Sequence, residues 1–357
     1  MTTMTASIPL QRIAKSRITD VDFNNLEFGK YISDHMLTVD FLDGKWQEPS
    51  IVPYGDILMS PAMLSLHYGQ SVFEGMKAFK NKNGICIFRP QKHSERLNKT
   101  LARMCMPEIP EEFFIQSLHA IVETDQAWIP TSEGGSLYLR PFVFAFEPRL
   151  GVKIADHFKF MVLTSPAGPY FSKPIRVKVE ETFVRAAEGG TGFAKCAGNY
   201  GGAFYPTQLA RQEGYDQVLW TDAKEHKYID EAGVMNVMFV INGKLVTPKL
   251  TSALLDGVTR DSILKLASVL GITVEQRKVS VAEIEEAFNN GTITEAFGTG
   301  TAAVVSPIAT ISIHKTDYNL PTVGPESFQH RVKEKLNNIR LGVEPDVHGW
   351  NYIIAAH

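Results

Sequence analysis

The sequence predicts a two-domain protein of mixed α and β structure (α+β). A chain of 357 residues that is 44% hydrophobic and 21% charged has enough apolar material for a large core and for more than one domain. Strand-like and helix-like segments alternate along the chain. One segment, SPAGPYFSKP, contains three prolines, a glycine and two serines, as a linker would. We therefore expect an N-terminal domain with an N-terminal arm at 1–164, the linker at 165–174 and a C-terminal domain at 175–357.

In the N-terminal domain we expect two helices among strands. Leu97, Leu101 and Met104 are spaced as on one face of a helix that begins at about His93, and Pro107 ends that helix. Alternating apolar residues predict the neighbouring strands. The expected elements are a strand at 85–88, helices from about 93 and at about 111–127, and strands at 136–147 and 158–164.

The C-terminal domain is expected to combine strands, a hairpin and several helices. Asn242 and Gly243 predict a tight hairpin turn, because both residues tolerate a positive φ. Gly271 marks the end of a helix that starts at about Arg260. The expected elements are strands at 175–184 and 217–221, a helix near 203–213, hairpin strands at 237–241 and 244–246, and helices from about 260, at about 281–289 and at about 326–340.

Charge and cysteine content argue against several classes of protein. A net charge of −3 without a long basic run argues against nucleic-acid binding. No apolar run approaches the roughly 18 to 20 residues that span a membrane. Three cysteines at unrelated spacings predict a reducing compartment without a disulfide framework, so we expect a cytoplasmic protein. Basic residues at 12, 15 and 17 precede the first acid, and we interpret this stretch as an arm rather than a targeting signal.

A glycine-rich stretch around Lys195 is the first candidate functional segment. Residues 189–202 read GGTGFAKCAGNYGG, with six glycines around a single lysine. Glycines allow the backbone to approach a ligand closely, so Lys195 is a candidate for a lysine that forms a Schiff base with a flat cofactor. A nucleotide-phosphate loop requires Gly-Lys-Ser/Thr, whereas Ala194 precedes this lysine and Cys196 follows it. The remaining alternative is a mobile, solvated surface loop.

A second candidate segment, GTGTAA at 298–303, follows an apolar strand-like run at 292–297. It fits the dinucleotide pattern G-x-G-x-x-A, which would imply an NAD-dependent oxidoreductase. We reject that interpretation, because Pro307 would interrupt the helix that the pattern requires and the residues from Ser312 onward look like a loop. A tight turn fits better, in which backbone amides and the hydroxyls of Thr299 and Thr301 bind a phosphate or a carboxylate.

A third candidate segment, GVTRD at 257–261, stands at the start of an expected helix. The backbone amides of Val258 and Thr259 could bind an anion together with the positive end of the helix dipole. Alternatively, Thr259 is an ordinary N-cap residue.

Nine sequence blocks together resemble the fold-type IV pyridoxal-phosphate enzymes, and specifically the branched-chain amino acid aminotransferases. The likeness covers nearly the whole chain from about Leu26. The blocks are SLHYGQSVFEGMKAF at 65–79, FRPQKHSERL at 88–97, SLYLRP at 136–141, EPRLGV at 147–152, KCAGNYGG at 195–202, DQVLW at 216–220, DEAGVMN at 230–236, DGVTRDS at 256–262 and FGTGTAA at 297–303. The resemblance implies a D-amino acid aminotransferase-like fold with a smaller N-terminal domain, a larger C-terminal domain and pyridoxal 5′-phosphate between them.

The resemblance also implies roles in cofactor binding. Lys195 would attach the cofactor and move a proton between substrate and cofactor, and Glu231 would keep the ring nitrogen protonated. Tyr200 would donate to the phenolic oxygen, and Arg96 would bind the phosphate. The other expected phosphate ligands are Val258, Thr259 and Thr301. Judged only by its sequence neighbours, Glu231 would be a surface acid.

For the substrate, the resemblance implies an aromatic pocket for an aliphatic side chain. The matching aromatic residues are Tyr68, Phe73, Tyr138 and Tyr170. Arg140 shares one face of a strand with Tyr138, and it could receive the second carboxylate of glutamate. The backbone of Thr301 and Ala302 would hold the α-carboxylate. Leu150 and Val152 match a loop that reaches the neighbouring subunit's site, which implies an obligate homodimer.

The implied activity is the reversible transfer of an amino group from leucine, isoleucine or valine to 2-oxoglutarate. A D-amino acid aminotransferase or an aminodeoxychorismate lyase of the same fold is an alternative, and an NAD-dependent oxidoreductase or a catalytically silent scaffold is a more distant one. An absorption spectrum of the purified protein separates the pyridoxal-phosphate enzymes from the two more distant alternatives, because a protein-bound pyridoxal-phosphate aldimine is yellow. Two positions depart from the family pattern. Val234 stands where relatives often have threonine, and Ala303 and Ser306 stand where some relatives have a Cys-x-x-Cys pair.

Overall fold

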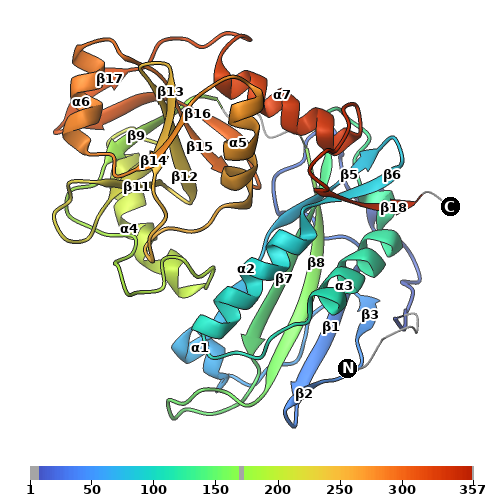
Figure 1. The fold of residues 1–357 in the computed structure, drawn as a ribbon. Coiled ribbons are helices and arrows are strands. Elements are labelled where there is room, and N and C mark those ends of the chain that lie inside the picture. The colour runs from blue at the N-terminus through green and yellow to red at the C-terminus, as the bar shows by residue number, and fades with distance from the viewer. Residues whose placement is uncertain (1–7, 169–172, 356–357) are drawn as a thin grey trace. The chain divides into compact units, whose positions relative to one another are not determined.

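The structure is a computed structural model that describes residues 8–168 and 173–355, and the chain divides into two compact units (Figure 1). The first unit comprises Met1–Tyr170, Lys195–Gly198 and Ile339–His357, and the second comprises Phe171–Ala194 and Asn199–Asn338. The lysine segment and the C-terminal residues belong to the first unit, which their positions along the chain did not reveal. The segment 165–174 begins inside a strand, and residues 169–172 of it lie outside the described residues.

In the described part of the chain, the first unit contains an antiparallel sheet of nine strands. The order is β18-β6-β5-β7-β8-β1-β2, with β3 paired to β1 and β4 paired to β7. The C-terminal strand β18 lies at one edge, next to β6. The strands are β1 (His35–Leu42), β2 (Lys45–Trp46), β3 (Ser50–Pro53), β4 (Ser71–Phe73), β5 (Met76–Asn81), β6 (Gly84–Phe88), β7 (Ser136–Ala145), β8 (Phe158–Ala167) and β18 (Asn351–Ala355).

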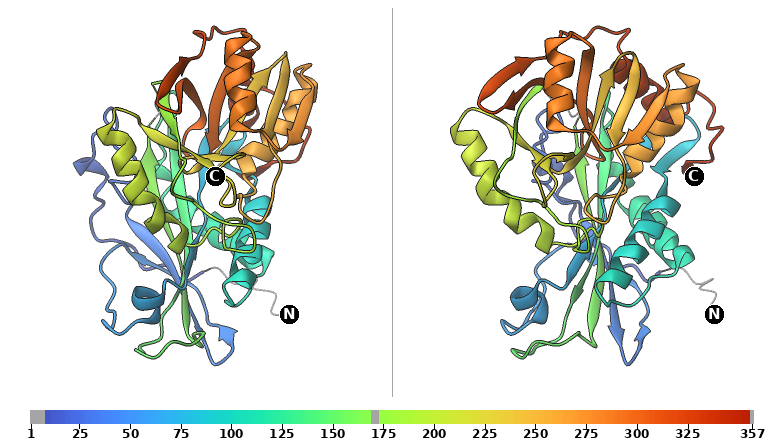
Figure 2. Two further views of the ribbon diagram at one scale, coloured as in Figure 1. Left: turned by 90° about the vertical axis from the view of Figure 1, so that its left-hand side faces the viewer. Right: turned by 60° about the vertical axis from the view of Figure 1, so that its left-hand side comes forward.

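Two helices, α2 (Pro90–Arg103) and α3 (Glu111–Thr124), lie side by side along this sheet (Figures 1 and 2). Helix α3 contacts β1 and β8, and it buries Phe114, Leu118 and Ile121, whose spacing places them on one face. Helix α2 starts at Pro90, three residues earlier than expected, because proline suits the first helical position. The shorter helices of this unit are η1 (Ile18–Asp20), α1 (Leu64–Tyr68) and η2 (Gln126–Trp128).

In the second unit, six strands close into a ring. The order β11-β10-β9-β16-β15-β12 is closed because β11 also pairs with β12, while β13 and β14 extend the sheet and β17 pairs with β16. The strands are β9 (Ile175–Val179), β10 (Gln217–Thr221), β11 (Ile229–Ala232), β12 (Met235–Ile241), β13 (Lys244–Pro248), β14 (Val274–Arg277), β15 (Ile293–Gly300), β16 (Val304–Ile313) and β17 (Thr316–Asn319). The helices in this part of the chain are α4 (Gly198–Gln212), α5 (Val258–Val269), α6 (Val281–Asn289) and α7 (Phe328–Leu341).

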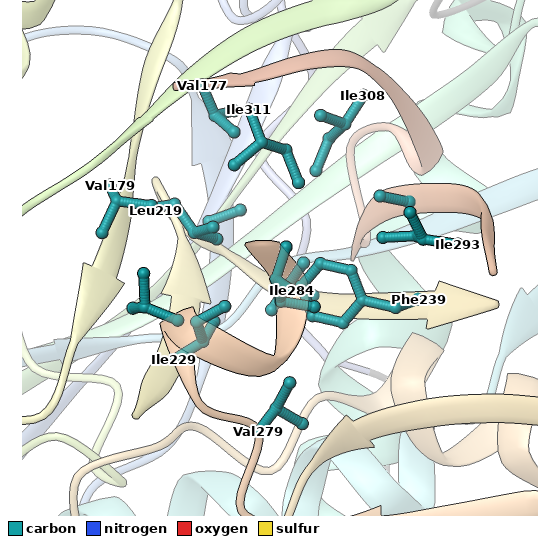
Figure 3. Packing of buried hydrophobic residues seen from close by; sticks show 14 of the residues in the cluster. Val177, Val179, Leu219, Ile229, Phe239, Val279, Ile284, Ile293, Ile308 and Ile311 are labelled. Atoms are coloured by element: carbon teal, nitrogen blue, oxygen red, sulfur yellow. The ribbon is translucent and has the colours of Figure 1, made fainter. Parts of the chain in front are cut away.

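The hydrophobic core of the second unit combines all six strands of the ring with α6 (Figure 3). Phe239 of β12 and Ile284 of α6 are completely buried near the centre of the view. Burial of aliphatic and aromatic side chains of this kind is the main stabilising contribution to such a unit.

Several predicted elements are confirmed. The strand at Gln217–Thr221 and the helix at Val281–Asn289 have the expected bounds. The hairpin turn is also confirmed, because Asn242 and Gly243 have φ values of 50° and 69°.

Two predicted elements of the second unit are present with different bounds, and one prediction was wrong. The helix expected near 203–213 is confirmed but begins at Gly198, since glycines hide its start in the sequence. The strand expected at 175–184 ends at Val179. Ser312 was expected in a loop but lies in β16, where pairing with β9 and β17 overrides the weak local pattern. Pro307 is compatible with this strand, because pairing with β9 starts only at Ile308.

Candidate active site

Lys195 lies in a short segment of the first unit whose backbone is held from two sides. Phe73 N–H donates to the Lys195 carbonyl at 3.1 Å, and Ala197 N–H donates to the Ser71 carbonyl at 2.9 Å, so the segment lies along β4. The Lys195 N–H donates to Thr100 Oγ1 on α2 at 3.0 Å. The segment is therefore fixed by hydrogen bonds, and the alternative of a mobile surface loop is wrong.

The amine of Lys195 has an unusual electrostatic environment. Its Nζ lies 4.7 Å from the centroid of the Phe73 ring. Burial, together with the positive charge of Arg96, lowers the pKa of Lys195 from 10.5 to about 8, whereas Glu74 acts in the opposite direction. An amine with this pKa is neutral in an appreciable fraction of molecules near neutral pH, as an attacking nucleophile or a base must be.

Arg96 lies on the same face of α2 as His93 and Thr100. Its Nε and Nη2 donate to the two carboxylate oxygens of Glu74 at 2.7 and 2.8 Å, and His93 Nδ1 donates to the same carboxylate at 2.7 Å. Although burial opposes ionisation, the Arg96 guanidinium holds the pKa of Glu74 well below its usual range. The first unit therefore contains a buried, ionised cluster beside Lys195, and its carboxylate, Glu74, was not among the predicted site residues.

Aromatic residues and Arg140 line the same region of the first unit. The Arg140 guanidinium lies 4.6 Å from the Phe73 ring centroid, and its Nη2 donates to the Tyr138 hydroxyl at 2.9 Å. The expectation that Tyr138 and Arg140 share a face is confirmed. Phe28 also contacts Tyr138, edge to face, with ring centroids 4.9 Å apart. Phe28 was missed because nothing in the local sequence of the N-terminal arm signals this long-range contact. Gly75 makes room for Tyr138, since a Cβ there would lie 2.1 Å from the hydroxyl oxygen.

In the second unit, Glu231 is buried on β11. Its Oε1 accepts hydrogen bonds from Asn236 Nδ2 and from the Leu255 N–H, both at 3.0 Å, and its Oε2 lies 3.0 Å from Arg185 Nε. Three positively polarised groups around one carboxylate favour its ionised form. The alternative of a surface acid is therefore wrong.

The glycine-rich stretch is closed by Asn199 at the start of α4. The Asn199 amide donates to the carbonyls of Thr191 and Ala194, both at 2.8 Å. Gly192 packs against the backbone of Ala253, where a Cβ would lie 2.2 Å from the carbonyl oxygen. Tyr200 follows in the first turn of α4 and is half-buried. The glycine content thus allows two backbone segments to approach closely, as the sequence suggested.

Helix α5 begins at Val258 and supplies a possible anion site. Its N-cap is Gly257, and no side chain caps this end. Thr259 therefore lies inside the first turn, and the alternative that it is the N-cap is wrong. Val258 and Thr259 are both buried, and their amides precede the first intrahelical bond, from Asp261 N–H to the Gly257 carbonyl.

The segment at 298–303 is a strand end and a turn. β15 continues to Gly300, which pairs with Val304 of β16, so residues 301–303 form the loop of a hairpin. A strand follows the motif instead of a helix, which rules out the dinucleotide fold. Thr301 and Ala302 are half-buried in the turn. Thr299 Oγ1 is buried and makes no hydrogen bond within the described residues.

Other predicted substrate residues lie at the surface. Tyr68, Leu150 and Val152 are exposed, and the Tyr68 hydroxyl donates to the Leu150 carbonyl. This hydrogen bond places the Tyr68 side chain next to Leu150. Val234 is also exposed, in the turn between β11 and β12. Tyr170 lies outside the described residues.

Among the helices described at 8–168 and 173–355, none is long and apolar enough to cross a membrane. Within the same residues, no group of three or more histidine, cysteine, aspartate or glutamate side chains is placed to hold a metal ion. All three cysteines, at 86, 105 and 196, are free.

Comparison with known proteins places these residues in a family. The model of the class IV amino-transferases matches residues 71–311. A probable branched-chain-amino-acid aminotransferase of Staphylococcus aureus (strain N315) is 44% identical over 336 residues, which is 93% of this chain and 94% of that protein. Branched-chain-amino-acid aminotransferase 2 of Bacillus subtilis (strain 168) is 40% identical over 361 residues, covering 100% of this chain and 99% of that protein.

Solved structures agree with the sequence relatives. The branched-chain amino acid aminotransferase of Escherichia coli is 26% identical with a TM-score of 0.71, over 88% of this chain and 98% of that one. The branched-chain amino acid aminotransferase of Thermobaculum terrenum, solved in its PLP-form, is 22% identical with a TM-score of 0.72, over 89% of this chain and 97% of that one, and it supports the fold. The chain therefore belongs to the class IV aminotransferases, and within them to the branched-chain aminotransferase family.

Proposed function

We propose that the protein transfers the amino group of leucine, isoleucine or valine reversibly to 2-oxoglutarate, with pyridoxal 5′-phosphate as cofactor. The observation that carries the proposal is Lys195, a half-buried lysine whose amine has a pKa of about 8 and whose backbone is held by Thr100 and β4. A structural lysine would gain nothing from such a site, whereas a lysine that binds a carbonyl needs its neutral form. The identity of 44% and 40% to two proteins that are named as branched-chain-amino-acid aminotransferases supports the choice of substrates.

The residues fit the chemical groups of this cofactor. In the first unit, the Arg96 guanidinium suits a phosphate dianion. In the second unit, the first turn of α5, at Val258 and Thr259, suits the same group, and the buried Thr299 hydroxyl beside the Thr301 turn offers a further donor. The buried carboxylate of Glu231 suits a protonated ring nitrogen, and the hydroxyl of Tyr200 suits the phenolic oxygen. When bound, the cofactor supplies an electron sink for the charge that develops as the substrate Cα loses its proton.

Two residues of the chain have separate roles in the proton transfer. Lys195 takes the proton from the substrate Cα and returns it at the cofactor's C4′ atom, which its lowered pKa permits. Glu231 keeps the proton on the ring nitrogen, since hydrogen bonds from Asn236 and Leu255 and the charge of Arg185 hold its carboxylate in the ionised state.

The aromatic group in the first unit suits an aliphatic side chain. Phe28, Phe73 and Tyr138 provide apolar walls, and Arg140 provides a cation for the second carboxylate of glutamate and 2-oxoglutarate. The turn at Thr301 and Ala302 would hold the α-carboxylate through its backbone amides. By resemblance, Tyr170 would join this pocket.

We propose in addition that the protein works as a homodimer in the cytoplasm. Tyr68, Leu150 and Val152 expose 43%, 69% and 78% of their surface, and Leu66 and Ile154 nearby in sequence are exposed as well. Apolar side chains gathered on one loop and an adjacent helix favour a partner surface. Free cysteines suit a reducing compartment.

The test of the cofactor assignment is direct. The purified protein should show the visible absorption of bound pyridoxal phosphate, and borohydride reduction followed by peptide mapping should place the pyridoxyl group on Lys195. Initial rates with L- and D-amino acids and 2-oxoglutarate then check the substrates. A label on another lysine, or a preference for D-amino acids, would refute the proposal.

Glu231→Gln is expected to preserve the fold and to slow Cα deprotonation on the order of a hundredfold, because a neutral amide cannot hold the proton on the ring nitrogen. Single-turnover rates with leucine measure the effect. Glu188→Gln is the matched control, since Glu188 is an exposed acid of the same unit. Near-normal rates in Glu231→Gln would show that this carboxylate has another role.

Subunit mixing tests whether Leu150, and with it Tyr68, whose hydroxyl contacts the Leu150 carbonyl, completes the site of the partner subunit. Lys195→Ala and a Tyr68→Ala, Leu150→Gly double variant should each be nearly inactive alone. Co-refolded at equal amounts, they should recover about a quarter of wild-type activity, because half of the dimers are mixed and each has one complete site. If Tyr68 and Leu150 instead serve their own subunit's site, no activity returns.

A further inference from the structure

Glu74 is a buried carboxylate among the site residues of the first unit, and the function proposed above gives it no role. It follows Phe73, the last residue of β4, and its side chain is completely buried. Burying a carboxylate is strongly unfavourable unless it is paired and hydrogen-bonded. The hydrogen-bond partners of Glu74 therefore indicate which groups its carboxylate binds.

Both oxygens of Glu74 are occupied. Oε1 accepts from Arg96 Nε at 2.7 Å, and Oε2 accepts from Arg96 Nη2 at 2.8 Å and from His93 Nδ1 at 2.7 Å. A planar guanidinium bound at two points to a carboxylate has a single orientation. Because His93 holds the second oxygen as well, the carboxylate cannot turn away without losing a further hydrogen bond.

The backbone on each side of Glu74 contacts other site residues. Phe73 donates its N–H to the Lys195 carbonyl, and its ring lies beneath the Lys195 amine. Gly75 packs against Tyr138. These contacts hold the backbone at Glu74 in place without any contribution from Arg96. The Glu74 carboxylate therefore has a defined position, and it can set the orientation of the Arg96 guanidinium.

We propose that Glu74 is a positioning residue for the phosphate-binding guanidinium of Arg96. Two of the five N–H donors of Arg96 are committed to Glu74, so the guanidinium is oriented before the cofactor arrives and its other donors keep a fixed direction. The inference rests on the proposed function, in which Arg96 binds phosphate. The alternative is an ion pair that only holds α2 to β4. A positioning role affects ligands that carry a phosphate, whereas a purely structural role affects all ligands alike.

The test replaces Glu74 with aspartate, which keeps the charge but is one methylene too short to reach both donors. Apoprotein is titrated with pyridoxal 5′-phosphate and, separately, with pyridoxal, which lacks the phosphate. We expect the Kd of pyridoxal 5′-phosphate to rise on the order of tenfold to a hundredfold and the Kd of pyridoxal to stay essentially unchanged. An equal change in both constants, or no change in either, would overturn the proposal.

Glu283→Asp is the matched control. Glu283 also accepts two hydrogen bonds from one guanidinium, that of Arg277, at 2.9 and 2.6 Å, but it lies on α6 in the second unit and is partly exposed. This variant should leave both dissociation constants unchanged. If the apoprotein of Glu74→Asp does not fold, the same titrations use His93→Leu, which removes one donor to Glu74 and should weaken only the binding of pyridoxal 5′-phosphate, by a smaller factor.

The wild-type protein separates failure of this inference from failure of the proposed function. If wild-type apoprotein binds pyridoxal 5′-phosphate no more tightly than pyridoxal, the phosphate role of Arg96 and the proposed cofactor are both wrong. If it prefers pyridoxal 5′-phosphate and the Glu74 and His93 variants keep that preference in full, only the positioning role of Glu74 is wrong.

Discussion

Replacing Lys195 with alanine is expected to lower the rate of Cα deprotonation on the order of ten-thousandfold. The lysine amine is proposed both to attach the cofactor and to move the proton, so one substitution removes two functions. The fold should persist, because the backbone of the lysine segment makes the hydrogen bonds with β4 and Thr100. The loss should therefore appear in the chemical step and not in the free energy of unfolding.

Stopped-flow spectroscopy with leucine in a single turnover measures this step. A small primary amine added to the buffer should restore part of the rate, because it can replace the missing base. Lys99→Ala serves as the control, since Lys99 lies on α2 with an exposed side chain that pairs with Glu95. Retention of a near-normal rate in Lys195→Ala would assign the proton transfer to another residue.

The lowered pKa of Lys195 gives a second measurement on the apoprotein. Burial disfavours the charged amine, so the neutral fraction should rise as the pH increases through about 8. Acylation of Lys195, followed by peptide mass spectrometry, should be half-maximal near that pH, whereas exposed lysines should titrate at about 10.4. A midpoint near the exposed value would mean that the amine is solvated in the apoprotein.

The fold could be predicted where local sequence decides the backbone. Asn242 and Gly243 tolerate a positive φ, so the hairpin was predictable, and α6 begins at an ordinary N-cap serine, Ser280. The closed ring of the second unit was not predictable, because the parallel pairings of β9 with β10 and with β16 join segments that are far apart in the sequence and are decided by tertiary contacts. For the same reason Ser312 was wrongly expected in a loop.

The candidate site could be predicted where a motif carries the chemistry, as at Lys195. Glu231 needed the family resemblance, because its burial comes from Asn236 and Leu255 on other segments. Phe28 and Glu74 were missed altogether. Phe28 contacts Tyr138, and Glu74 binds Arg96. Folding brings each pair together, and no local spacing in the sequence encodes such a contact.

Arg140→Ala is expected to weaken the half-reaction with 2-oxoglutarate by roughly 2 to 4 kcal/mol in kcat/KM and to change the leucine half-reaction far less. Leucine brings no charge on its side chain, whereas 2-oxoglutarate brings a second carboxylate that is costly to desolvate without a cationic donor. The buried Nε of Arg140 makes no hydrogen bond in the described part of the chain, so the guanidinium has a donor left for a ligand.

The structure also offers a competing role for Arg140, because its Nη2 donates to the Tyr138 hydroxyl and its guanidinium covers the Phe73 ring. Tyr138→Phe separates the two roles, since it removes only the hydroxyl and keeps the apolar wall. If Arg140 recognises the carboxylate, stopped-flow rates should show selective loss with 2-oxoglutarate in Arg140→Ala and little loss in Tyr138→Phe. Equal loss in both half-reactions of Arg140→Ala would mean that the guanidinium holds the aromatic wall in place, and the discrimination between the two partners would then have to come from other residues.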